Sequence, residues 1–157
     1  MPVMRFPRTG HAALRRHRID LPDQVYLITA TTADRQPLFG AFEGACAAAP
    51  CHHQPDVLRT SVLLAWVLMP DHAHWLVRLG ERDGMASFTN RLKSAIARAY
   101  NHRLERTGPV WARAYHDHAL RQEEDVRVAA RYVVANPVRA GLVKRVGDYP
   151  FWNAVWL

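Results

Sequence analysis

The feature that most constrains the fold is an almost continuous apolar stretch over residues 61–69, which Pro70 and Asp71 interrupt and residues 72–79 continue. A short apolar run bounded by turn residues is typical of a strand buried inside a sheet. The tight break at Pro70 and Asp71 favours an antiparallel hairpin between the two segments. We therefore expect a sheet with this hairpin near its centre.

The remaining segments predict strands and helices in mixed order around the hairpin. Residues 24–32 are rich in β-branched and aromatic side chains, which is typical of a strand. In residues 85–106 apolar side chains recur every three or four positions, which predicts a helix. The other expected elements are a helix over 38–49, a loop over 51–55, a strand over 115–121 and a helix over 123–136. This order predicts an antiparallel α+β fold with helices packed mainly on one face of the sheet.

The charge of the chain points to a polyanionic partner. It carries 21 basic and 14 acidic residues, a formal charge of +7, and 19 of the basic residues are arginine. Twelve of the 21 lie between Arg91 and Arg145. Arginine forms paired hydrogen bonds with phosphates and stacks on bases, so this composition favours a nucleic acid. A solvated basic surface, or the codon usage of a GC-rich genome, would explain the same composition.

The sequence shows two cysteines, no signal peptide and no apolar run long enough to span a membrane. We expect a cytoplasmic protein with reduced thiols, in which a basic arm over residues 1–22 precedes a single domain over residues 23–157. Cys46, Cys51, His52 and His53 are residue types that bind zinc, but their spacing is not that of the common zinc sites.

His72 and His74 are the first candidates for chemistry. Alternate residues of a strand share a face, so both imidazoles would point to the same side of the hairpin. His116 and His118 form a second pair with the same spacing, in which the intervening Asp117 would point away from a shared metal. The apolar strand before His72 and the small residue between the imidazoles favour the first pair.

Tyr132 and Asn136 are the second candidate pair, because a step of four residues puts both side chains on one face of a helix. Each residue also has a structural interpretation. An aromatic residue at helical spacing usually belongs to the core, and Asn136 before Pro137 would suit the N-cap of a short helix that Gly141 ends.

Taken together and in chain order, these motifs resemble one family. They are the strand pair His72-Ala73-His74, the segment 115–121 after Trp111, and the sequence Tyr132-x-x-x-Asn136-Pro-Val-Arg-Ala-Gly-Leu. The set resembles the REP-associated tyrosine transposases, which belong to the HUH superfamily of single-strand nucleases and transposases. Residues 26–29, 35–39 and 148–152 are also similar to this family, so the resemblance covers about residues 15–152.

The resemblance implies a ferredoxin-like α+β sheet with the histidines on a central strand. It implies that His72 and His74 bind a divalent metal, Mg²⁺ or Mn²⁺, and that Tyr132 is the nucleophile. Asn136 matches the position that completes metal coordination, where related insertion-sequence transposases usually have glutamine. His118 lies in a stretch typical of the family and is taken as an accessory residue of undefined role.

A tyrosine nucleophile beside a metal ion is chemically reasonable. The tyrosine hydroxyl is a poor nucleophile at neutral pH, and a divalent cation withdraws charge from the scissile phosphate. Attack leaves a 5′-phosphotyrosine and a free 3′-hydroxyl, and the covalent link keeps the energy of the phosphodiester for rejoining. Two imidazoles and an amide oxygen suit Mn²⁺ by ligand preference, whereas cellular supply favours Mg²⁺. The expected function is metal-dependent cleavage and rejoining of single-stranded or hairpin (REP-like) DNA.

Two other functions fit the same residues. A non-catalytic hairpin-DNA-binding protein would need only the arginines, and a replication-initiator-like HUH nuclease shares the histidine pair. We expect a monomer rather than a dimer. The arm over residues 1–22 is expected to read unpaired bases with its arginines and Phe6, or else to add only salt-sensitive affinity. The expected DNA contacts are Arg5, Arg8, Arg15, Arg16, Arg18, Arg91, Arg98, Arg121 and Arg139.

Overall fold

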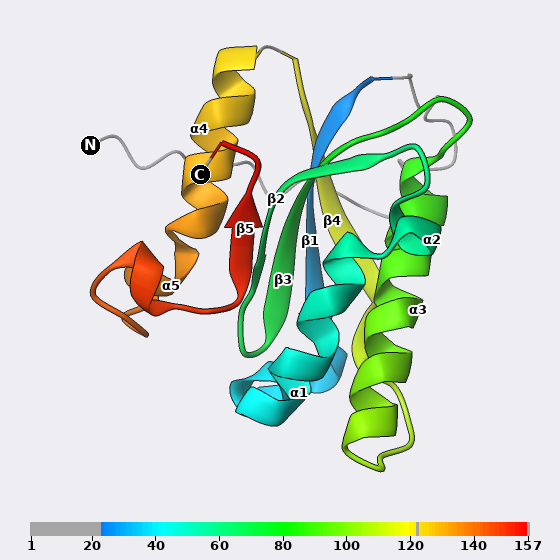
Figure 1. Cartoon of the computed structure of the whole chain (residues 1–157), viewed down its shortest axis with the longest axis vertical. Coiled ribbons are helices and arrows are strands. Elements are labelled where there is room, and N and C mark those ends of the chain that lie inside the picture. The colour runs from blue at the N-terminus through cyan, green and yellow to red at the C-terminus, as the bar shows by residue number, and fades with distance from the viewer. Residues whose placement is uncertain (1–22, 122, 157) are drawn as a thin grey trace.

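A five-stranded antiparallel sheet forms the middle of the protein, with the strand order β4-β1-β3-β2-β5 (Figure 1). The computed structural model describes residues 23–121 and 123–156. The predicted arm over residues 1–22, with its five arginines and Phe6, therefore lies outside the described residues. The strands are β1 (Val25–Thr32), β2 (Val62–Leu68), β3 (His72–Arg78), β4 (Trp111–Leu120) and β5 (Trp152–Ala154).

The predicted hairpin is confirmed. Strands β2 and β3 pair antiparallel, and the Met69 N–H donates to the His72 carbonyl oxygen at 2.8 Å across the two-residue loop. Strand β3 also pairs with β1, so it is the central strand of the sheet. Because both of its faces are covered, the alternating side chains of β3 enter two separate apolar layers.

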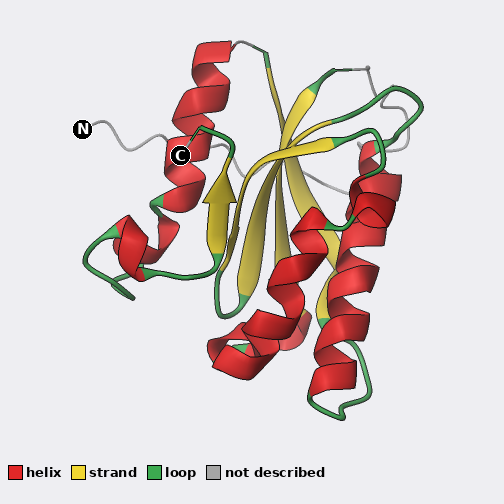
Figure 2. Ribbon diagram, in the orientation of Figure 1, coloured by secondary structure: helices red, strands yellow, loops and turns green. Residues whose placement is uncertain are grey.

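The helices cover both faces of the sheet unequally (Figure 2). Helices α1 (Phe42–Ala48), α2 (Pro55–Leu58) and α3 (Met85–Arg103) lie on one face, and α4 (Glu123–Val134) lies on the other. The short helix α5 (Asn136–Arg139) follows α4 directly. Four 3₁₀ turns complete the described elements: η2 (Ala33–Arg35), η3 (Leu38–Gly40), η4 (Ala49–His53) and η5 (Val146–Asp148). The antiparallel α+β class is confirmed, with the larger helical layer on one face.

One local prediction was wrong, and one strand was missed. The expected loop over residues 51–55 includes the end of η4, and α2 begins at Pro55. Proline suits the first turn of a helix, where its missing N–H would have no partner in any case. Strand β5 was not predicted, because three residues at the edge of the sheet carry too little periodicity to be recognised.

The pleat of β3 decides which residues face which layer. Ala73, Trp75 and Val77 belong to the larger core, beneath α1 and α3. Leu76 belongs to the second core, beneath α4. His72 and His74 share the parity of Leu76 along the strand, so they lie on the α4 face.

His52 is part of the larger core and is not free to bind zinc. Its Nδ1–H donates to the Ala49 carbonyl oxygen at 3.0 Å, and its Nε2 accepts the indole N–H of Trp75 at 3.0 Å. The imidazole also stacks on Trp66 with the ring centroids 3.9 Å apart. Complete burial lowers the pKa of His52 to about 3. Among the described residues, no cluster of three or more His, Cys, Asp or Glu side chains is placed to hold a metal.

The neutrality of His52 predicts sensitivity of the fold to acid. In the unfolded chain the His52 imidazole is protonated below its ordinary pKa of 6.5. In the folded protein it stays neutral down to about pH 3. The free energy of unfolding should therefore fall as the pH drops through this window. His52→Gln keeps a donor and an acceptor but cannot titrate. The free energy of unfolding in urea would be measured between about pH 7 and about pH 4.5, where its slope against pH gives the number of protons taken up on unfolding. This number should be smaller by about one in the variant than in the wild type. An equal pH dependence in both proteins would contradict the assignment.

Candidate active site

The two histidines of β3 lie side by side on the face that α4 covers. The ring centroids of His72 and His74 are 4.9 Å apart. His74 is buried and His72 is half-buried. Their neighbours on β1 are Thr31 opposite His72 and Thr29 opposite His74. The expectation that the pair shares one face of a central strand is confirmed.

Asp71 orients His72. The His72 Nδ1 lies 2.7 Å from the Asp71 Oδ1, and a carboxylate can only accept, so Nδ1 carries the proton. In a neutral imidazole this leaves the lone pair on Nε2 available to a ligand. Asp71 is held in turn by Arg35, whose guanidinium nitrogen lies 3.5 Å from the second carboxylate oxygen.

Thr29 holds His74 in the same way. The Thr29 Oγ1 lies 2.8 Å from the His74 Nδ1, and the hydroxyl can accept the proton of that nitrogen. Burial, together with the charges of the nearby His72 and Arg139, lowers the pKa of His74 to about 3. His74 is thus neutral at physiological pH, which is the form that binds metals.

Tyr132 reaches this pair from α4. Its ring centroid lies 6.2 Å from that of His74, with the two rings inclined at 67°. Helix α4 is fixed over the sheet by the buried side chains of Ala129, Ala130 and Val133. Tyr132 itself is only half-buried, so its ring lies between the apolar layer and the surface.

Arg139 makes a close cationic contact with Tyr132. The central guanidinium carbon lies 3.8 Å from the centroid of the Tyr132 ring, and one terminal N–H donates to the Tyr132 carbonyl oxygen at 2.9 Å. Arg139 was predicted only as a DNA contact. The structure brings it to the tyrosine because α4 ends at Val134 and the chain continues after a single turn residue, Ala135, into α5.

Asn136 lies one turn after Tyr132 and is half-buried. Helix α5 begins at Asn136, and its N-cap is Ala135, with no side-chain capping hydrogen bond. The capping interpretation of Asn136 is therefore wrong. No cluster of three His, Cys, Asp or Glu side chains is found among the described residues, so Asn136 as the third metal donor stays a prediction.

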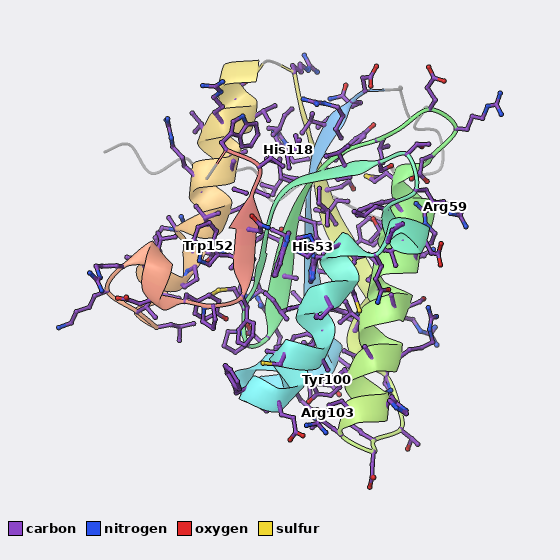
Figure 3. The ribbon with its side chains drawn as sticks, viewed as in Figure 1. His53, Arg59, Tyr100, Arg103, His118 and Trp152 are labelled. Atoms are coloured by element: carbon purple, nitrogen blue, oxygen red, sulfur yellow. The ribbon has the colours of Figure 1, made fainter. Side chains whose placement is uncertain are left out.

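The second histidine pair lies on the same face of the sheet but on the edge strand β4. His116 and His118 are opposite Thr29 and Leu27 of β1, so β1 separates them from the first pair. Two strand spacings amount to about 9.6 Å. Asp117 is buried opposite Ile28, on the other face, which agrees with the expectation that it points away. Figure 3 shows His118 on this strand.

The predicted DNA-contacting arginines have different environments. Arg91 donates two hydrogen bonds to the carboxylate of Asp83, at 2.9 and 2.7 Å, and a third to the Val57 carbonyl oxygen at 3.0 Å. Its side chain is only 16% exposed, so Arg91 ties α3 to neighbouring segments. Arg98 is exposed, but it lies on α3, over the face opposite the histidines. Arg121 is exposed just after β4.

A family model described as "Transposase IS200 like" matches residues 56–136, a range that contains both histidines of β3, Tyr132 and Asn136. This match covers more than half of the sequence. The chain belongs to the IS200-like transposase family.

Relatives of this transposase family agree with that assignment. The REP-associated tyrosine transposase of Escherichia coli (strain K12) is 34% identical over 87 residues, which are 55% of this chain and 50% of that protein. The chain thus spans about half the length of this curated relative. A solved structure described as a REP-associated tyrosine transposase bound to a REP hairpin superposes with a TM-score of 0.68 and 25% identity, covering 88% of this chain and 81% of that one. Within the described part of the IS200-like chain, no helix has the length and hydrophobicity of a membrane span.

Thr29 was not identified from the sequence, and the role of Asp71 was missed. Asp71 lies in the turn between β2 and β3, so the sequence alone suggests only a role in that turn. Thr29 is one of several threonines at the end of β1, and only the register of β1 against β3 shows that it faces His74. A cross-strand contact of this kind has no local signal.

The hydrogen bond between the Thr29 hydroxyl and the His74 Nδ1 predicts that Thr29 affects metal affinity. Thr29→Val keeps the shape of the side chain but leaves the His74 Nδ1 without its partner. Loss of such an orienting contact should weaken Mn²⁺ binding about tenfold, as titration calorimetry would measure. Thr31→Val is the matched control, because Thr31 lies opposite His72 and makes no side-chain hydrogen bond among the described residues. Equal affinity in both variants would show that Thr29 does not position His74.

Proposed function

We propose that this chain cuts and rejoins single-stranded or hairpin DNA through a covalent bond between Tyr132 and a 5′-phosphate. The observation that carries the proposal is the placement of Tyr132, 6.2 Å from His74 between ring centroids, beside two imidazoles whose Nδ1 atoms are both engaged. A hydroxyl nucleophile next to two oriented nitrogen donors is the arrangement that metal-assisted phosphoryl transfer requires.

The residues present fit a divalent metal ion. His72 and His74 would hold it through Nε2, and the half-buried Asn136 would add an amide oxygen. When bound, Mg²⁺ or Mn²⁺ would act as a Lewis acid on the scissile phosphate. Asp71 and Thr29 would keep the imidazoles in the required tautomer and orientation, as partners of metal-binding histidines commonly do.

The chain's own residues would carry the exchange of bonds. The Tyr132 oxygen would form a bond to phosphorus while the bond from phosphorus to the 3′-oxygen breaks, which leaves a 3′-hydroxyl after that oxygen takes up a proton. The tyrosine proton is released as its oxygen attacks. Arg139 lies against the ring of Tyr132, where its positive charge would stabilise negative charge on the phenol oxygen and on the phosphate. Attack by a 3′-hydroxyl on the phosphotyrosine would reverse the step.

The DNA partner is inferred from charge and from a relative. The chain has a formal charge of +7, and the superposed solved transposase is described as bound to a REP hairpin. A hairpin would bring phosphates to the arginines, with unpaired bases beside the stem available for recognition. The basic arm over residues 1–22 as a reader of those bases, and the monomeric state, stay predictions.

The nucleophile can be tested with a hairpin oligonucleotide that carries an unpaired flank. In Mg²⁺ or Mn²⁺, wild-type protein should form a protein–DNA adduct that survives denaturing electrophoresis, and Tyr132→Phe should form none. Tyr100→Phe is the matched control, because Tyr100 lies on α3, over the other face (Figure 3). Wild-type levels of adduct from Tyr132→Phe would refute the assignment. Metal-independent binding without any adduct would favour a non-catalytic hairpin-binding protein.

The choice of histidine pair can be tested in the same assay. His72→Ala and His74→Ala should each lower adduct formation at least about a hundredfold, because the remaining donors hold the metal poorly. Hairpin affinity should stay close to that of the wild type, since arginines supply the phosphate contacts. His116→Ala and His118→Ala are the controls from the edge strand. If only these two variants lost metal binding, the site would lie on β4 and not on β3.

A further inference from the structure

A groove lies on the flank of α4 opposite to Tyr132. It has a volume of about 300 Å³ and runs between α4 and the segment that follows β5. Figure 1 shows α4 and β5 side by side. The lining residues are Arg127, Ala130, Arg131, Val134, Ala154 and Trp156.

Two exposed arginines form one side of the groove. Arg127 and Arg131 are one helical turn apart on α4, and neither has a carboxylate or other hydrogen-bonding partner among the described residues. Like charges at this spacing repel each other and destabilise a helix slightly. A negatively charged group bound between them would remove this cost, so the pair is complementary to a phosphate.

An exposed tryptophan forms the other side. Trp156 is 39% exposed, which is unusual for so large an apolar ring, and Val155 beside it is 58% exposed. The Val155 N–H donates to the Leu64 carbonyl oxygen at 2.9 Å, which holds this segment against the sheet and next to α4. An aromatic face beside two guanidinium groups matches a nucleotide, with its flat base and its charged phosphate.

The groove is close enough to Tyr132 to serve the same DNA strand. Arg127, Arg131 and Val134 follow one another at steps of four and three residues on one flank of α4, whereas Tyr132 is turned toward β3. A helix with its side chains is about 10 Å wide. A strand that crosses α4 would therefore reach the groove a few nucleotides from the phosphate at Tyr132.

We propose that this groove binds an unpaired stretch of the DNA strand that Tyr132 cuts. Trp156 stacks on a base, and Arg127 and Arg131 contact the adjoining phosphates. The occupant is unpaired because a duplex stem keeps its base faces stacked inside and offers none to an aromatic side chain. The inference rests on the proposed function, and it adds a subsite for the flanking strand.

The first experiment compares two oligonucleotides by fluorescence anisotropy, one a blunt hairpin and the other the same hairpin with an unpaired flank. The double variant Arg127→Gln/Arg131→Gln and the single variant Trp156→Ala should each bind the flanked hairpin about tenfold more weakly. Both should bind the blunt hairpin as the wild type does. For the double variant, the slope of affinity against salt concentration on the flanked hairpin should fall by about 1.4.

The controls separate a specific groove from a generally basic surface. Arg59→Gln removes an exposed arginine on the side of α2, over the other face of the sheet (Figure 3), and should bind both oligonucleotides normally. Trp156→Phe retains an aromatic face and should keep most of the flank affinity. Since the substituted side chains are exposed, the core is intact, and circular dichroism would verify that each variant is folded.

A second experiment detects the stacked base directly. 2-Aminopurine is placed at successive positions of the flank, and its fluorescence is quenched where a ring stacks on it. Wild-type protein should quench one position more strongly than its neighbours, and Trp156→Ala should abolish that difference. An equal pattern of quenching in both proteins would overturn the role of Trp156.

Other outcomes would contradict the proposal that the groove binds the flank, while leaving the cleavage reaction of Tyr132 unaffected. If the variants lost affinity equally for the blunt and the flanked hairpins, the arginines would be part of a general phosphate surface. If Trp156→Ala instead dissociated a dimer in sedimentation and left the preference for the flank unchanged, the groove would be an interface between copies of this chain. In either case the wild type would still form its covalent adduct, whereas failure of the proposed function would abolish the adduct on every oligonucleotide.

Discussion

The antiparallel pairing of β3 with β1 and β2 is the constraint on which the rest of the structure depends. This pairing puts Thr29 opposite His74 and buries both faces of the central strand. Because successive residues of a strand face opposite sides, a slip of one residue would turn both histidines into the larger core. Trp75 and Val77 would then have to leave that core, so the register that buries them also holds the imidazoles on the face of α4.

The two faces of the sheet serve different purposes. Beneath α1 and α3, His52 has a partner on each nitrogen, and Arg91 donates three hydrogen bonds to Asp83 and Val57. The buried indole N–H of Trp66 is an exception on this face, because it has no hydrogen-bond partner among the described residues. Beneath α4, within the part of the chain that the structure describes, the two histidines of β3 have a hydrogen-bond partner on one ring nitrogen only. His72 and His74 each use Nδ1 for an internal contact and leave Nε2 to another ligand. A buried polar group without a hydrogen-bond partner costs stability, and a ligand bound at the two Nε2 atoms would remove that cost.

Much of the fold and of the candidate site was predictable from local patterns. The hairpin was readable because two apolar runs flank a turn, and α3 because its apolar residues keep helical spacing over many turns. Helix α2 and strand β5 were not, because each has only three or four residues and depends on a neighbour for its stability. In the site, the spacing of His72 with His74 and of Tyr132 with Asn136 identified each pair. The supporting contacts of Thr29, Asp71 and Arg139 were missed as such, because they join residues to partners that periodicity does not reveal.

The sequence by itself determined which side chains share a face, because the periods of strand and helix are properties of the backbone. It therefore determined that His72 and His74 lie on the same face of a strand. It also determined the excess of arginine, which favours binding to a polyanionic partner. Only the tertiary structure decided that α4 covers the same face of the sheet as the histidines, which brings Tyr132 to His74 across 58 positions of sequence. It also decided which arginines are hydrogen-bonded inside the protein and which are exposed to solvent. Burial and hydrogen-bond partners depend on how distant segments pack and not on residue type.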